Sequence, residues 1–279
     1  MRTESHRGRH VKLLRRLLIA IIALVAIAYA GVVGYMYVNQ RALQYAATGP
    51  VIPLADTALS GAEDIALPSG DGVIHGWYQA PRPGLPVIVY YKGNSKSFGE
   101  EHERYEAFVA AGYGFIAFDY RGFPASPGQI TEDNILADAL TAYDWAAAKG
   151  DPLVIWGRSI GSGPATYVAS QRDAKALLLE TPFLSAVGVA AERYPYLPVY
   201  WVMQDQFRSD EWIKDVAEPV FVGHGTADTT VDVSNGERLY ALAPNPYELW
   251  IVPGVGHSDL WAAGIWDKAR PFFESVMTP

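Results

Sequence analysis

The chain has 279 residues, half of them hydrophobic, which suffices for one α/β domain with a large core plus an appendage. It contains no cysteine, which excludes disulfides, thiol nucleophiles and zinc–thiolate sites. The formal net charge is −8, and because residues 1–16 carry a net +5, residues 17–279 carry −13, which makes nucleic acid an unsuitable partner.

The first forty residues predict a membrane anchor. Residues 1–16 carry six basic side chains and one acid, whereas residues 17–40 are uncharged and almost entirely apolar. A helix over that stretch can cross a hydrocarbon core of about 30 Å, and its basic flank keeps the N-terminal side in the cytoplasm. We therefore expect a cytoplasmic tail over residues 1–16 and a single-pass signal-anchor helix over 17–40. The remaining chain then lies on the extracytoplasmic (periplasmic) side of the cell membrane.

A cleaved signal peptide is the alternative for this segment. Ala28-Tyr29-Ala30 is a small-x-small cleavage site after a short apolar run. The apolar stretch continues ten residues past that site, longer than a signal peptide needs, which favours an uncleaved anchor. Both alternatives export the rest of the chain. Residues 41–62, which include Pro50 and Pro53, are expected to form a juxtamembrane linker.

From residue 63 the sequence has the rhythm of an α/β domain. Strands at 63–67 and 73–79 are separated by Pro68-Ser69-Gly70-Asp71-Gly72, which predicts a hairpin. Apolar runs then alternate with amphipathic stretches, as in the βαβ units of a parallel sheet. Six further strands are expected at residues 86–91, 115–119, 153–156, 176–180, 219–224 and 248–252. Helices are expected at 100–111, 131–149, 160–172, 233–242 and 259–277.

This layout predicts the α/β-hydrolase fold over residues 63–279: a mostly parallel eight-stranded sheet with helices on both faces. Residues 183–214 interrupt the rhythm, being too long for a simple connection and rich in tyrosine and tryptophan. We expect a short lid there, with a helix packed on the sheet as the alternative.

The centre of the predicted site is Gly157-Arg158-Ser159-Ile160-Gly161. An apolar strand precedes this motif and small residues that open a helix follow it, as in a nucleophile elbow. Such a turn holds the serine in strained backbone geometry, and only residues without bulk let strand and helix approach closely on either side. Ser159 is therefore the predicted nucleophile.

The predicted base is His257, in the loop between the last strand and the last helix, where this fold carries its histidine. His224 ends a strand and is expected to have a structural role in its turn. The predicted acid is Asp228, which follows the strand at 219–224. Glu180, Asp119 and Asp232 remain rivals for the acid.

A tetrahedral intermediate also needs backbone donors for its oxyanion. In this fold they come from the residue after the nucleophile and from the loop after the third strand. The first is the amide of Ile160. The second loop is Tyr91-Lys92-Gly93-Asn94-Ser95, where Gly93 permits close approach, so we expect the amide of Asn94 to be the second donor.

The chain from about Gln44 onward resembles the membrane-anchored α/β-hydrolases related to the ABHD protein depalmitoylases and their bacterial homologues. The resemblance rests on six segments in a specific order: Tyr91-Lys92-Gly93-Asn94, Asp119-Tyr120-Arg121-Gly122, Gly157-Arg158-Ser159-Ile160-Gly161, Glu180-Thr181-Pro182-Phe183, His224-Gly225-Thr226-Ala227-Asp228 and Gly254-Val255-Gly256-His257. It implies the triad Ser159, Asp228 and His257. Such proteins usually carry histidine where this chain has Lys92, a cation that would bear on substrate charge and fit.

The expected activity is hydrolysis of an ester or thioester of a lipid-like acyl substrate at the membrane, through an acyl-enzyme on Ser159. No metal or cofactor is implied. Lys92, Tyr200 and Trp201 are the expected substrate contacts; alternatively, the aromatic side chains only fill the interface between lid and sheet. A peptidase or lipase of the same fold remains open. So does a binding module without catalysis, whose mark would be a missing triad member.

Overall fold

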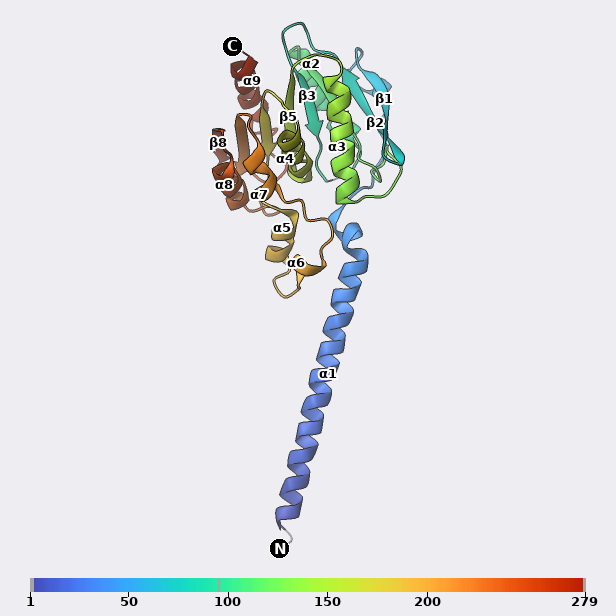
Figure 1. The fold of residues 1–279 in the computed structure, drawn as a ribbon, viewed down its shortest axis with the longest axis vertical. Helices are drawn as coiled ribbons and strands as arrows, with labels where there is room; N and C mark the ends of the chain where they lie inside the picture. The colour runs from blue at the N-terminus through green and yellow to red at the C-terminus, as the bar shows by residue number, and fades with distance from the viewer. Residues whose placement is uncertain (1–2, 95, 278–279) are drawn as a thin grey trace.

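A computed structural model describes residues 3–94 and 96–277, and within them eight strands form one sheet (Figure 1). The order is β1-β2-β4-β3-β5-β6-β7-β8, with the first two pairings antiparallel and the rest parallel. The strands are β1 (Glu63–Ser69), β2 (Gly72–Gln79), β3 (Val87–Tyr91), β4 (Gly114–Phe118), β5 (Leu153–Arg158), β6 (Leu177–Glu180), β7 (Val220–Gly225) and β8 (Pro246–Val252). The predicted hairpin and mostly parallel eight-stranded sheet are confirmed.

The centre of the sheet is apolar because helices cover both of its faces. Val89 of β3 pairs with Ile116 of β4 and Ile155 of β5, and all three are fully buried. Strands buried on both faces form near-continuous apolar runs rather than alternating patterns. The continuous apolar runs in the sequence therefore correctly indicated buried parallel strands.

The covering helices divide into two layers. Helices α3 (Glu132–Ala147), α4 (Ser162–Gln171) and α8 (Val233–Leu242) contribute to one core, and α2 (His102–Ala110) and α9 (Ile265–Met277) to the other. Parallel strands all end at one edge of a sheet, and in such folds sites form at that edge. Ser159 directly follows β5 there.

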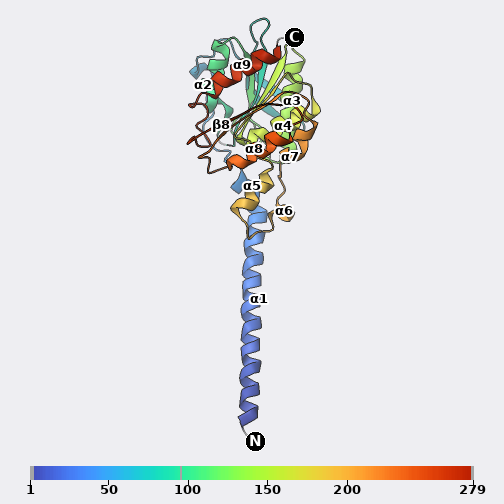
Figure 2. The same ribbon diagram turned by 90° about the vertical axis from the view of Figure 1, so that its left-hand side faces the viewer.

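Helix α1 (Thr3–Gln44) extends from this same end of the domain as a long rod (Figures 1 and 2). Its portion Arg9–Gln44 is long and apolar enough to cross a membrane, with a mean hydropathy of 2.7 in its most apolar window. The helix continues four residues past the predicted boundary at 40, because Arg41, Ala42, Leu43 and Gln44 are all good helix formers.

Residues 41–62, the predicted juxtamembrane linker, pack against the sheet domain once α1 has ended. After α1 the chain lies on the domain and includes a short 3₁₀ turn at Leu54–Asp56. Tyr45 and Leu59 are buried, each joining one of the two cores. Tyr45 and Leu59 therefore attach this segment to the sheet domain. Their packing fixes the point at which α1 joins the domain.

The interval 183–214 forms α5 (Ala186–Arg193), α6 (Val199–Val202) and α7 (Ser209–Trp212). Helices α5 and α6 project beyond the sheet beside the upper part of α1 in both views (Figures 1 and 2). Helix α7 instead packs on α4, where Trp212 meets Tyr167 edge to face. Only the first part of the interval therefore stands away from the sheet as a lid would.

Candidate active site

Ser159 is located on a tight, strained turn at the end of β5. Its φ is 52°, in the left-handed region that non-glycine residues rarely adopt. A Cβ at Gly157 would lie 2.4 Å from the Ala165 Cβ, and one at Gly161 would lie 2.1 Å from the Tyr91 carbonyl oxygen. The glycines of the motif therefore permit two close approaches, one between strand and helix and one to the end of β3.

His257 and Asp228 complete a continuous hydrogen-bonded chain with this serine. The Ser159 Oγ lies 2.7 Å from His257 Nε2, and His257 Nδ1 lies 2.6 Å from Asp228 Oδ2. This is the arrangement of a nucleophile, a base and an orienting acid. The three predicted residues, separated by up to 98 positions, thus lie within hydrogen-bonding distance, each of the next.

The Asp228 carboxylate is held as an acceptor from several sides. Its Oδ1 accepts the amides of Thr230 and Val231 at 2.8 and 2.9 Å, and its Oδ2 lies 3.1 Å from His224 Nε2. Burial by itself raises the pKa of Asp228, but the hydrogen bonds from His224 and His257 and the Val231 amide lower it well below its ordinary value. Asp228 is therefore ionised when it faces the imidazole.

His224 was predicted only as a structural residue of this turn, and it touches the candidate acid directly. Its Nε2 also lies 3.0 Å from the Val231 carbonyl oxygen, which requires a proton on that nitrogen. The ring is fully buried beside Gly236, where a Cβ would come within 2.5 Å of Nδ1. The sequence signal was a histidine four residues before the acid, which alone does not indicate contact.

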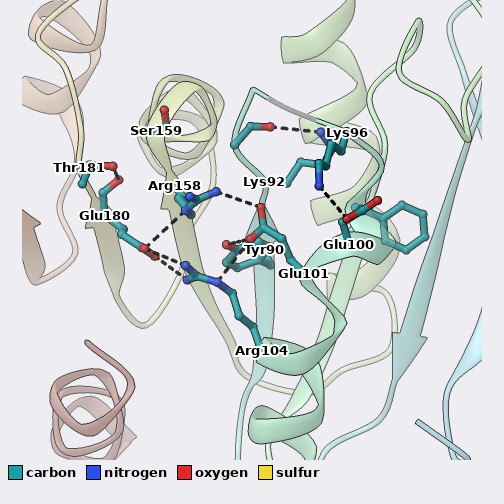
Figure 3. Close-up of polar contacts among 12 residues, drawn as sticks. Tyr90, Lys92, Lys96, Glu100, Glu101, Arg104, Arg158, Ser159, Glu180 and Thr181 are labelled. Atoms are coloured by element: carbon teal, nitrogen blue, oxygen red, sulfur yellow. Dashed lines mark hydrogen bonds and ion pairs between the residues drawn. The ribbon is translucent and has the colours of Figure 1, made fainter. Parts of the chain in front are cut away.

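Glu180, the main rival for the acid, is part of a separate buried ion network (Figure 3). It accepts two hydrogen bonds from Arg104, at 2.7 and 2.9 Å, and one from the Trp156 indole at 3.0 Å. Arg158 contacts Glu101 at 3.1 Å and lies 3.5 Å from Glu180. The Ser159 side chain points away from this network in Figure 3.

The other two rivals also have structural partners. Asp119 accepts the amides of Phe98 and Ala125, at 2.8 and 2.9 Å. Asp232 caps the N-terminus of α8 by accepting the Ser234 amide at 2.9 Å. Of the four acids considered, Asp228 is the one hydrogen-bonded to His257.

Asn94 and Ile160 line the same cavity as Ser159, as oxyanion donors must. A Cβ at Gly93 would lie 3.8 Å from the Ser159 Cβ, so this loop passes directly beside the nucleophile. The Asn94 side chain donates to the Gln44 carbonyl at 2.6 Å, which ties the loop to the end of α1. The donor role of the two amides remains a prediction.

Lys92 does not point into this cavity. Its side chain is 1% exposed, with Nζ 3.7 Å from Asp119 and 3.9 Å from the centre of the Phe123 ring. Burial lowers the pKa of Lys92 to about 8, although the charge of Asp119 opposes the shift. The structure therefore places Lys92 in an internal ion pair with Asp119. The prediction that Lys92 contacts the substrate is wrong.

Tyr200 and Trp201, the other expected substrate contacts, lie on the outside of α6. They are 60% and 91% exposed, and neither lines the cavity around Ser159. Val199, Val202 and Met203 occupy the side of α6 that faces the cavity. In a helix of a single turn, packing of neighbouring elements decides which side is buried, so the aromatic content of the sequence was a misleading guide.

The cavity has a volume of about 370 Å³, within the range of small-molecule sites. Ser159 lies in its lining together with side chains of α1, α5 and α6. Of the side chains lining it that the structure describes, Arg193 is the one with a formal charge. Within residues 3–94 and 96–277 no group of three or more His, Asp or Glu side chains is placed to hold a metal ion.

Comparisons with known proteins point to related hydrolases. An uncharacterized protein of Mycobacterium tuberculosis is 33% identical over 246 residues, which cover 86% of this chain and 88% of that protein. Human protein ABHD12B is 34% identical over 195 residues, and the rat lysophosphatidylserine lipase ABHD12 is 32% identical over 213 residues. These matches cover 61% and 66% of this chain, but only 54% and 53% of the two relatives.

Solved structures agree on the fold. An esterase of Pyrococcus furiosus matches 82% of this chain and 96% of its own, with a TM-score of 0.64 and 18% identity. An acetyl xylan esterase from Paenibacillus matches 86% of this chain and 93% of its own, with a TM-score of 0.64 and 20% identity. No protein-family model matches the chain.

Proposed function

We propose that this chain cleaves lipid-like acyl esters through Ser159, His257 and Asp228. The chain belongs to the α/β-hydrolase family that includes ABHD12 and ABHD12B, and it is a hydrolase acting on ester bonds. The observation that carries the proposal is the hydrogen-bonded chain from Ser159 through His257 to Asp228, at 2.7 and 2.6 Å. The chain spans about half the length of its ABHD relatives, so their activity enters here only as support.

In the proposed reaction Ser159 attacks the acyl carbonyl while His257 Nε2 takes the hydroxyl proton. His257 then protonates the leaving alcohol, and water releases the acyl group from the serine by the reverse sequence. Asp228 accepts from Nδ1, which fixes the imidazole tautomer and stabilises its charged form. The amides of Ile160 and Asn94 stabilise the oxyanion, each worth about 10²–10³ in turnover.

The nature of the cavity supports a substrate with an apolar acyl chain. Aliphatic side chains from three helices dominate its lining, and one relative is named a lysophosphatidylserine lipase. We propose a carboxylic ester with one long acyl chain as the substrate class, with a thioester as the second candidate. The basic residues within 1–16, on the N-terminal side of the uncharged stretch 17–40, support a catalytic domain outside the cytoplasm.

Replacing the nucleophile tests the proposal directly. Ser159→Ala should abolish both labelling by a fluorophosphonate and hydrolysis of p-nitrophenyl esters, because no other group supplies the acyl-enzyme oxygen. Ser162→Ala is the matched control, since Ser162 is buried three residues further on and its hydroxyl has no hydrogen-bond partner among the residues that the structure describes. The control should label and hydrolyse like the wild type.

Other outcomes identify the alternatives. A wild-type protein that neither labels nor hydrolyses esters would be a binding module. Labelling accompanied by hydrolysis of amides but not of esters would indicate a peptidase. Faster cleavage of acyl-CoA thioesters than of matched oxygen esters would select the thioester candidate.

A further inference from the structure

One face of the membrane helix forms part of the cavity wall around Ser159. The side chains of α1 in the lining are Val33, Met36, Tyr37, Gln40, Leu43 and Gln44. Their spacing of three and four residues places them on a single stripe of the helix. Val32 and Val38, on other faces, are 52% and 79% exposed.

The opposite wall comes from the lid. Val189 and Ala190 of α5 and Val202 and Met203 of the α6 region line the same cavity. Apolar side chains on both walls provide no partners for a polar group, but they match an alkyl chain. The cavity thus lies between α1 and the lid, with the nucleophile in its lining.

Helix α1 is fixed to the lid by specific contacts. Arg41 donates to both oxygens of Asp205, at 2.9 and 3.2 Å, and Tyr45 donates to the same carboxylate at 3.0 Å. Gln40 accepts the Gln204 amide at 2.7 Å and donates to the Val202 carbonyl at 3.3 Å. The exposed fraction of Asp205 is only 2%, so this junction is part of the folded site rather than a chance contact.

The cavity also extends into the part of α1 that is suited to lipid. From Gln44 to Val33 the helix advances by about 16 Å at 1.5 Å per residue. Val33 and Met36 lie within the uncharged stretch 17–40. The Tyr29 hydroxyl, one turn deeper than Val33, donates to the Tyr196 carbonyl at 2.8 Å, which holds the α5–α6 loop at that level.

We propose that α1 is a substrate-binding element as well as an anchor. The acyl chain of a bilayer lipid enters between α1 and the α5–α6 lid, and its ester reaches Ser159 while the chain stays beside Val33 and Met36. The proposal rests on the proposed function, because it assumes that Ser159 acts on lipid esters. It predicts that residues of the membrane helix determine acyl-chain selectivity.

Full-length variants in phospholipid vesicles test the proposal. Val33→Trp fills the deep end of the cavity, whereas Val32→Trp places the same side chain at the same depth on another face. For Val33→Trp, kcat/KM for a p-nitrophenyl ester of a long chain should fall at least tenfold relative to the acetate ester. Each displaced methylene contributes about fourfold, the equivalent of about 0.8 kcal/mol. Val32→Trp should keep the wild-type ratio.

Met36→Ala covers the case in which the bulky variant does not fold. It enlarges the cavity without creating a clash, and should shift the preferred chain length upward. The proposal is overturned if the chain-length profile of Met36→Ala is that of the wild type, or if Val33→Trp and Val32→Trp have equal ratios. Failure of the proposed function is distinguishable, because the wild type would then hydrolyse no ester in a Ser159-dependent way.

Discussion

At the scale of single residues, two buried acids near the end of the sheet differ in their hydrogen-bond donors, and we propose different functions for them. Asp228 accepts from two imidazoles and two amides, whereas Glu180 accepts from Arg104 and the Trp156 indole. The first arrangement suits the proposed acid that orients His257, and the second pairs Glu180 with the buried cations Arg104 and Arg158. Substitution of each acid should therefore affect a different property.

Asp228→Asn should lower kcat by about 10³–10⁴ with little change in melting temperature, because the amide favours the wrong imidazole tautomer. Glu180→Gln should instead destabilise the fold by about 3 kcal/mol, because Arg104 and Arg158 lose a buried counter-charge. The measurements are ester turnover and thermal unfolding of both variants. A larger loss of turnover in folded Glu180→Gln than in Asp228→Asn would contradict the assignment of the acid.

Lys92 gives a prediction for pH dependence. Burial lowers the pKa of its ammonium to about 8 in the folded chain, against 10.5 as the ordinary value. Between these two values the unfolded chain binds more protons, so the free energy of unfolding gains from Lys92 as pH rises from about 8 to 10.5. Its contribution is fully present above that window and is lost as pH falls through 8.

The comparison is with Lys92→Met, which cannot titrate. The difference in unfolding free energy, wild type minus variant, should rise by up to about 1.4 kcal/mol per pH unit across the window. Denaturant unfolding of the detergent-solubilised proteins at pH 7, 8, 9 and 10 measures it. Ionisation of buried tyrosines affects both proteins and largely cancels. A difference that is flat with pH would show that Lys92 is not desolvated in the fold.

At the scale of elements, α6 separates two kinds of side chain. Its inner side borders the cavity, while Trp201 is 91% exposed. The loop before α6 is bound to Tyr29, within the uncharged stretch of α1, through the Tyr196 carbonyl. Tryptophan favours the interface between membrane and water. In vesicles containing brominated phospholipid, Trp201→Phe should therefore remove a large share of the quenchable tryptophan fluorescence.

Trp212→Phe is the matched control for this measurement, because Trp212 packs on Tyr167 within the domain. Its removal should lower the total emission but leave the fraction quenched by bromolipid equal or higher. Equal loss of quenching in the two variants would show that the lid stays in water.

The elements differ in how well the sequence predicted them. The strands and their mostly parallel pairing follow from apolar runs that alternate with amphipathic stretches. The assignments of Ser159, Asp228 and His257 rest on a glycine-bounded turn and on chain order in the fold. The stripe at Val33 and Met36 carries no such signal, because the stretch 17–40 of α1 is almost entirely apolar and shows no hydrophobic periodicity. Tyr200 and Trp201 were assigned by composition, whereas the packing of α6 decides their orientation.

At the scale of the whole molecule, the proposed anchoring by α1 implies that the lid end of the domain faces the membrane. Helix α1, the lid and Ser159 all lie at that end (Figure 1), so in the proposed arrangement the candidate active site is near the lipid surface on either side of the membrane. The basic residues within 1–16, at the N-terminal end of the chain, then predict the side, since basic flanks remain in the cytoplasm. We expect the catalytic domain outside the cytoplasm and the N-terminal tail inside.

The absence of cysteine makes this orientation directly measurable. Glu237→Cys introduces a thiol on the exposed side of α8, and Lys12→Cys introduces one near the N-terminus of α1. In right-side-out membrane vesicles an impermeant maleimide should label Glu237→Cys at once and Lys12→Cys only after detergent is added. Because the anchor is expected to be uncleaved, both labelled proteins should run at the same full-length mass. Labelling of Lys12→Cys in sealed vesicles would reverse the topology, and a mature protein that begins at Gly31 and lacks the Lys12 label would show cleavage after Ala30.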